Sequence, residues 1–346
     1  MTTMPPAITG GVDTHLDVHV AAALDQSGAL LATASFETTP RGYRRLLRWL
    51  RSFGDVALVG VEGTGSYGAG LTRYLQSHDV RVVEVDRPNR QRRRRRGKSD
   101  TQDAITAARA AQSGDANGDA KTRNGSVEAI RVLRVARSSA RKERARALNQ
   151  MRSLVSTAPD EIRTELRGLT VAALLHRCSS YRPSKGTDVL SATKIALRVL
   201  ARRALVLREE IDRLDAVISP LVEATAPELL ERDGVGIETA AALLVAAGDN
   251  PERLRSERTF AHLCGVAPID ASSGKHERHR LSRSGDRQAN SALWRIVITR
   301  MAHHQPTRDY VARRVAEGLT KQEAIRCLKR YVAREVYNHL PRQQLA

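Results

Sequence analysis

Hydrophobic and polar residues follow two different periods along the first hundred residues of this chain. Short apolar runs, of the kind that form strands, cover residues 8–13, 17–24, 30–36, 56–61 and 80–85. Helical spacing appears in three stretches: the first begins at residues 39–40, and the other two cover residues 67–78 and 100–112. A turn at residues 25–28 predicts a hairpin between the second and third strands. The pattern therefore predicts an α/β domain over residues 7–115.

Beyond residue 125 the pattern becomes helical and strongly charged. Two long helices are expected within residues 126–222, joined by a loop at 178–187 that contains proline and glycine. Such a pair predicts an antiparallel coiled-coil arm, which is either a dimerisation arm or a simple helical spacer. The last part, residues 223–342, is predicted to be mainly α-helical. The expected fold class is thus α/β plus α, in three domains.

A glycine turn lies near the start of the last part. Gly234 and Gly236 flank Val235 between two helical stretches, in the manner of a helix-hairpin-helix motif. After such a turn, backbone N–H groups at the helix N-terminus can bind a phosphate. Glycine turns between helices also occur for packing alone, so both interpretations stay open.

Four acidic residues fall at corresponding ends of the predicted elements. Asp13 ends the first strand, Glu62 ends the fourth, and Asp100 and Asp103 open the helix at 100–112. Three antiparallel strands followed by helix, strand, helix, strand and helix is the element order of the RNase H-like fold, in which these points converge at one edge. Four carboxylates there suit two hard cations for phosphoryl chemistry. Singly, each acid is more often a strand end or a helix cap, but their coincidence favours a metal site.

The charge of the chain points to a polyanionic partner. Lys and Arg outnumber Asp and Glu by 57 to 38, and the formal net charge is +19. Aromatic residues are only 3% of the chain, which favours contacts with a nucleic-acid backbone over base stacking. No apolar run reaches the roughly 18 residues that span a membrane, and three scattered cysteines favour a reducing cytoplasm.

Basic residues gather in two places beside candidate chemistry. Directly before the helix at 100–112, the run consists of Arg92, Arg93, Arg94, Arg95, Arg96 and Lys98. A run of this kind is usually a solvated face, but its position favours contact with nucleic acid. The second group follows Ser272-Ser273-Gly274 and consists of Lys275, Arg278, Arg280, Arg283 and Arg287. A serine ringed by cations is a candidate nucleophile for a phosphodiester, although Ser-Ser-Gly is also an ordinary loop.

With these motifs assembled, the chain resembles the DEDD transposases of bacterial insertion sequences whose element encodes a bridge RNA. The resemblance covers nearly the whole length, in motifs that are weak singly and strong in this order. They are Gly11-Val12-Asp13-Thr14-His15, Val61 to Tyr67, Gly97 to Ala104, Ala267-Pro268 through Ser273-Gly274, and Arg283 to Asn290. Where the family often carries a lysine after the first acid, this chain has Leu16.

The resemblance implies a RuvC-like N-terminal domain, a coiled-coil arm and a C-terminal domain that bears a serine. Asp13, Glu62, Asp100 and Asp103 would bind Mg²⁺, with two ions expected. Ser273 would attack DNA and form a covalent phosphoserine link, with Ser272 as the reserve.

The resemblance also implies the partners. Carboxylates and serine would come from different subunits, so a homodimer or a tetramer is expected. A bridge RNA would pair with donor and target DNA. Two other functions stay open: a hydrolytic RuvC-like nuclease or junction resolvase, in which the serine only contacts phosphate, and a nucleic-acid-binding protein without catalysis.

Overall fold

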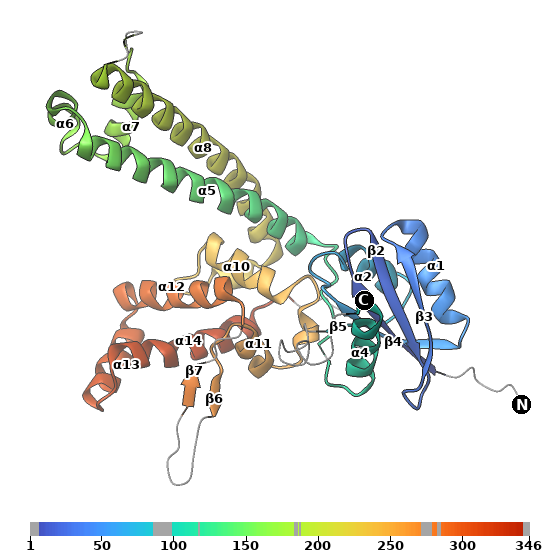
Figure 1. Cartoon of the computed structure of the whole chain (residues 1–346). Coiled ribbons are helices and arrows are strands. Elements are labelled where there is room, and N and C mark those ends of the chain that lie inside the picture. Colours follow the sequence, from blue (N-terminus) through green and yellow to red (C-terminus); the bar gives the residue numbers. More distant parts are fainter. Residues whose placement is uncertain are drawn as a thin grey trace, which may run out of the picture. The chain divides into compact units, whose positions relative to one another are not determined.

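The structure is a computed structural model that describes residues 7–85, 99–116, 118–182, 186, 188–270, 279–281 and 285–341 (Figure 1). It divides into two compact units. One unit combines Met1–Glu128 with Arg232–Ala346, and the other is Ala129–Glu231. The division into domains 7–115, 126–222 and 223–342 stays a prediction. No helix among the described residues is both long and apolar enough to cross a membrane.

One five-stranded mixed sheet organises the N-terminal part of the chain (Figure 1). Each predicted apolar run forms a strand within two residues of its expected bounds: β1 (Ala7–Thr14), β2 (Val18–Leu24), β3 (Leu30–Glu37), β4 (Asp55–Glu62) and β5 (Val82–Val85). The strand order is β3-β2-β1-β4-β5. Adjacent strands among β1, β2 and β3 are antiparallel, whereas β4 pairs in parallel with both β1 and β5. The expected α/β architecture is confirmed.

Helices cover both faces of this sheet. Residues of α1 (Pro40–Arg51) and α2 (Ala69–Gln76) share one hydrophobic cluster with Ala21 and Ala23 of β2. Because side chains alternate along a strand, Ala22 points to the other face, where it packs with residues of α4 (Asp100–Gln112). The sheet therefore has a hydrophobic core on each face: α1 and α2 cover one face, and α4 covers the other.

Two glycines allow α4 to lie directly on the sheet. Gly11 of β1 is paired with Gly60 of β4. A Cβ atom at Gly11 would lie 2.2 Å from the backbone nitrogen of Ala108, and one at Gly60 would lie 2.6 Å from the carbonyl oxygen of Ala107. Only residues without a side chain fit this contact between helix and strand. The glycines thus fix the depth at which α4 sits.

The unit Ala129–Glu231 contains more helices than the sequence predicted. The long helices are α5 (Ser126–Thr157) and α8 (Val189–Thr225). Between them, and mostly before the loop expected at 178–187, lie two short helices that were not predicted, α6 (Asp160–Leu166) and α7 (Val171–Ser179). These two short helices contribute Ile162, Leu166, Leu174 and Leu175 to a separate core with both long helices. A dimerising coiled coil stays a prediction.

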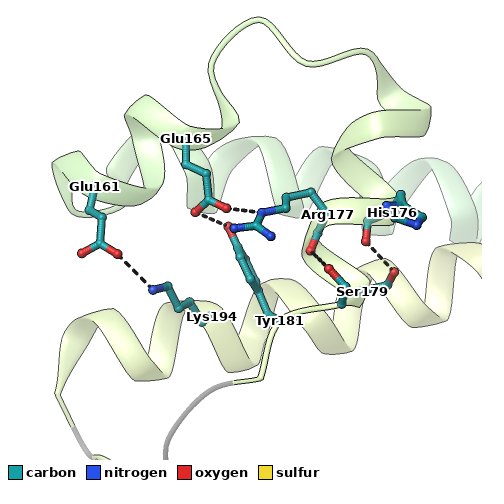
Figure 2. A network of polar contacts seen from close by, with 8 residues as sticks. Glu161, Glu165, His176, Arg177, Ser179, Tyr181 and Lys194 are labelled. Carbon is teal, nitrogen blue, oxygen red and sulfur yellow. Dashed lines mark hydrogen bonds and ion pairs between the residues drawn. The ribbon is translucent and has the colours of Figure 1, made fainter.

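A polar network closes this small core (Figure 2). Glu165 of α6 accepts hydrogen bonds from the Arg177 guanidinium and from the Tyr181 hydroxyl. Burial and Glu165 together raise the pKa of Tyr181 well above its usual value. Lys194 of α8 pairs with Glu161 at 3.1 Å. The network ties α6 and α7 to the start of α8.

The C-terminal part is mainly helical, as expected. Its larger elements are α10 (Ile237–Ala247), α11 (Glu257–Leu263), α12 (Arg287–His303), α13 (Gln305–Ala316) and α14 (Lys321–Asn338). The shorter ones are the helix α9 (Pro227–Leu230), the 3-10 helix η1 (Pro251–Leu254) and the two-stranded pair β6 (Pro268–Asp270) and β7 (His279–Leu281). Gly234 adopts φ = 71°, which favours glycine, and Gly236 is the N-cap of α10. A helix-hairpin-helix at this place stays a prediction.

Two neighbouring polar residues hold the chain together where α5 begins. Both carboxylate oxygens of Asp249 accept hydrogen bonds from the first turn of α5, at 2.8 Å from the N–H of Val127 and 3.2 Å from that of Glu128. Asn250 bonds to the carbonyl of Ala120 and to the N–H of Thr122. The start of α5 is therefore capped by residues from much later in the sequence.

A buried histidine makes the fold sensitive to acid. His19 of β2 is fully buried, its ring stacks on Tyr43, and neither ring nitrogen has a hydrogen-bond partner among the described residues. Burial, together with the charge of His15, lowers the pKa of His19 from 6.5 to about 4.

We expect the free energy of unfolding to fall by up to about 3 kcal/mol between pH 6.5 and pH 4 through His19. In that window the unfolded chain binds a proton at His19 and the folded chain does not, so acid favours unfolding. Urea unfolding at several pH values would measure the effect. The variant His19→Phe should lose this slope, and an unchanged slope would contradict the assignment.

Candidate metal centre

The end of β1 is held beside the end of β4. The two strands run parallel, and the Thr14 hydroxyl donates a hydrogen bond of 2.8 Å to the carbonyl of Glu62. Asp13 and Glu62 are therefore brought to the same edge of the sheet, where both are at least nine-tenths buried. This register is consistent with the prediction from sequence that the two strand ends meet.

The first turn of helix α4 brings two more carboxylates close to this edge. Asp100 and Asp103 lie in that turn, and the N-cap residue Ser99 makes no capping hydrogen bond with its side chain. A capping box involving Ser99 and Asp103, which is the simplest structural role for these residues, is therefore not formed through the serine hydroxyl. The positive end of the helix dipole favours acids at this position.

Asp13, His15 and Asp100 form a compact group. One ligand atom from each lies within 4.8 Å of the others. The His15 Nε2 atom is 3.1 Å from the Asp13 carboxylate and 3.4 Å from that of Asp100. These three side chains are close enough together to bind one metal ion. The two carboxylates supply the oxygen ligands that hard divalent cations prefer.

The electrostatics of Asp13 also favour a cation. Burial raises the pKa of Asp13, His15 opposes that shift, and the charges of Asp103 and Asp100 raise it further. Asp103 thus lies close enough to act on Asp13, although it is outside the compact group, as is Glu62. A divalent cation would relieve both the burial and the repulsion, so the residues present fit such an ion.

His15 is a residue of this group that the sequence reasoning did not assign. It appears in the first motif, two positions after Asp13. Side chains two apart in an extended segment point to the same side, and this spacing is the signal that would have included it. Leu16, which stands where the family often has lysine, is exposed.

Other predicted site residues are only partly covered by the structure. Outside the described residues lie the basic run Arg92 to Arg96 with Lys98, and also Ser272, Ser273, Lys275, Arg278 and Arg283. Arg280 lies in β7. Arg287 begins α12 and is exposed. Their expected roles stay predictions.

Comparison with known proteins decides the family. Residues 10–158 match the model of the DEDD transposases of IS110 elements, and residues 226–312 match the model described as "Transposase IS116/IS110/IS902 family". The chain belongs to the IS110 family of transposases. The first match contains all four predicted acids and the second contains Ser273, so the family resemblance read from the motifs is confirmed.

A relative of this IS110-family chain is the "Insertion element IS110 uncharacterized 43.6 kDa protein" of Streptomyces coelicolor. The two sequences are 36% identical over 152 residues, which are 42% of this chain. The match spans 36% of the length of that relative.

Proposed function

We propose that this IS110-family chain is a recombinase that cuts and rejoins DNA with bound divalent cations. The cations would bind at the carboxylate edge, which is the sheet edge at the ends of β1 and β4 together with the first turn of α4, and which carries Asp13, Glu62, Asp100 and Asp103. The observation that carries the proposal is the group of Asp13, His15 and Asp100 at the end of β1. The sheet order β3-β2-β1-β4-β5 supports an RNase H-like, RuvC-like domain, because the first and fourth strands are adjacent in it and end at the same edge.

The roles of the residues follow from their chemistry. Asp13 and Asp100 would hold the cation, Glu62 and Asp103 would complete the set, and two Mg²⁺ ions are expected from four carboxylates. Bound Mg²⁺ would stabilise the charge that develops on the phosphate during strand cleavage. His15, between two of the acids, would keep their oxygens aligned. The positive end of the α4 dipole would stabilise the negative charge of Asp100 and Asp103 in the first turn.

The finer mechanism is taken from the family resemblance. Ser273 would attack a DNA phosphodiester: its Oγ would bond to phosphorus, one bond from phosphorus to a deoxyribose oxygen would break, and that oxygen would leave as a hydroxyl that takes up a proton in exchange for the one lost by serine. The covalent phosphoserine intermediate would conserve the bond energy for rejoining. The basic residues around it, and the glycine turn at Gly234 and Gly236 before α10, would bind phosphates. A bridge RNA would pair with donor and target DNA. Carboxylates and serine would come from different subunits, through a coiled-coil arm in residues 126–222.

A covalent-linkage assay tests this function. The chain is incubated with bridge RNA, donor and target DNA and Mg²⁺, and DNA-linked protein is sought on a denaturing gel. We expect the linked species from the unaltered chain and from Ser272→Ala, but not from Ser273→Ala.

Each other outcome has a definite meaning. Linkage by Ser273→Ala would contradict the choice of nucleophile. Free cut ends without linked protein would favour a hydrolytic nuclease or resolvase. Binding of RNA with no change in DNA would favour a nucleic-acid-binding protein without catalysis.

A further inference from the structure

Helix α1 presents an unbroken arginine face to solvent. Its polar positions are Arg41, Arg44, Arg45, Arg48 and Arg51, all exposed, and we refer to these five as the α1 arginine face. They recur three or four positions apart, so they lie on one side of the helix. On the opposite side, Gly42, Leu46, Leu47 and Leu50 are buried. The helix contains no acidic residue.

This face is electrostatically unfavourable for an isolated protein. Five pairs among its arginines are three or four positions apart, and like charges at that spacing destabilise a helix by about 0.2–0.5 kcal/mol a pair. Arg41 also lies in the first turn, where the helix dipole disfavours a cation. None of the five has a carboxylate partner among the described residues. A polyanion bound here would offset the repulsion.

The α1 arginine face starts next to the candidate metal centre. Thr38, just before the helix, donates a backbone hydrogen bond of 2.9 Å to the carbonyl of Asp17, and its hydroxyl donates one of 3.2 Å to the carbonyl of His15. Thr39 caps the helix. From this end, the ten positions between Arg41 and Arg51 extend about 15 Å along the helix axis.

The dimensions and chemistry of the face favour a double helix of DNA. About 15 Å is longer than the roughly 12 Å width of the B-DNA major groove, so the arginines can reach both backbones. The aromatic residues of α1, Tyr43 and Trp49, pack against the hydrophobic core and leave no stacking platform for single-stranded bases. The major groove of an RNA duplex is narrow and deep, which fits a helix less well.

We propose that the α1 arginine face binds the phosphate backbone of duplex DNA, beside the carboxylate edge. That this duplex leads to the strand being cut rests on the proposed function, whereas binding itself does not. Its arginines belong to a different part of the sequence from the basic regions at residues 92–98 and 275–287.

The test compares two variants of the full chain with equal charge loss. One is Arg41→Gln/Arg44→Gln/Arg45→Gln/Arg48→Gln, which retains Arg51 because it donates to the carbonyl of His78. The matched control replaces four exposed arginines of α5 and α8 by Gln at Arg141, Arg152, Arg202 and Arg203. Binding to a fluorescein-labelled 30-base-pair DNA duplex is measured by anisotropy over a salt series in EDTA, where no cleavage occurs.

We expect the α1 variant to bind at least about tenfold more weakly near 0.1 M salt, and its salt slope to fall by about 2 or more, since each phosphate contact contributes about 0.9. The control should change both quantities much less. Equal losses in the two variants would show that net charge alone sets binding and would overturn the proposal.

Two further measurements complete the design. Removal of like charges should leave the unfolding temperature of the α1 variant equal or higher, and a lower temperature with weaker binding would overturn the proposal as a folding defect. A loss confined to a matched RNA duplex would overturn the choice of DNA. Failure of cleavage in the linkage assay, with DNA binding as expected here, would count against the proposed function alone.

Discussion

Replacing Asp13 by Asn is expected to reduce Mg²⁺-dependent DNA cleavage by at least about 1,000-fold, which corresponds to about 4 kcal/mol of transition-state stabilisation. Asp13 is the most enclosed carboxylate of the compact group and contacts His15. The amide of Asn keeps the shape and one acceptor oxygen but loses the charge that, in the proposed site, would hold the cation. Cleavage rates on donor DNA, with equal RNA binding by both proteins, measure the effect.

The neighbouring Asp17 gives a matched control for this change. Asp17 is exposed and lies just before β2, four positions from Asp13. The variant Asp17→Asn removes the same charge and should cleave at the rate of the unaltered chain. The metal-site assignment is wrong if Asp13→Asn and Asp103→Asn both retain cleavage within about tenfold.

The second large effect is expected at Gly11, where Gly11→Ala should lower the free energy of unfolding by at least about 3 kcal/mol. The added Cβ would lie 2.2 Å from one backbone atom of α4 and 2.3 Å from another, so no side-chain rotation relieves the clash. Either α4 moves away from the sheet or the domain unfolds. Because α4 carries Asp100 and Asp103, cleavage should fall as well. Urea unfolding measures the stability.

Gly118 is the control for Gly11. A Cβ atom at Gly118 has no heavy atom within 4 Å, and the residue is not in the left-handed region. Gly118→Ala should therefore leave the free energy of unfolding within about 0.5 kcal/mol of its original value. A tolerated alanine at Gly11 would contradict the contact between α4 and the strand.

The sequence alone was enough to predict the sheet and its helices, because these elements carry strong local signals. The strands are bounded by turns and acids, and Thr39-Pro40 marks the start of α1 at the observed residue. The helices α6 and α7 were missed because 7 and 9 residues are too few for a helical period to stand out. Their existence depends on packing against α5 and α8, which a local pattern does not contain.

The candidate site was predictable in part for the same reason. Asp13 and Glu62 end strands, so fold topology alone brings them to one edge. The contribution of His15 depends on distances of 3.1 and 3.4 Å to two acids, one of which comes from α4. Such distances depend on how closely α4 approaches the sheet. Gly11 and Gly60 set that approach, and nothing in their local sequence says so.

The cap that Asp249 places on α5 has a consequence for how the protein is made. The capped N–H of Val127 precedes Asp249 by 122 residues, so at about 5–20 residues per second the ribosome delivers the cap roughly 6 to 24 s after the helix start. During that interval the first turn of α5 lacks its carboxylate partner. A chain truncated before Asp249 would lack this cap on the first turn of α5 altogether.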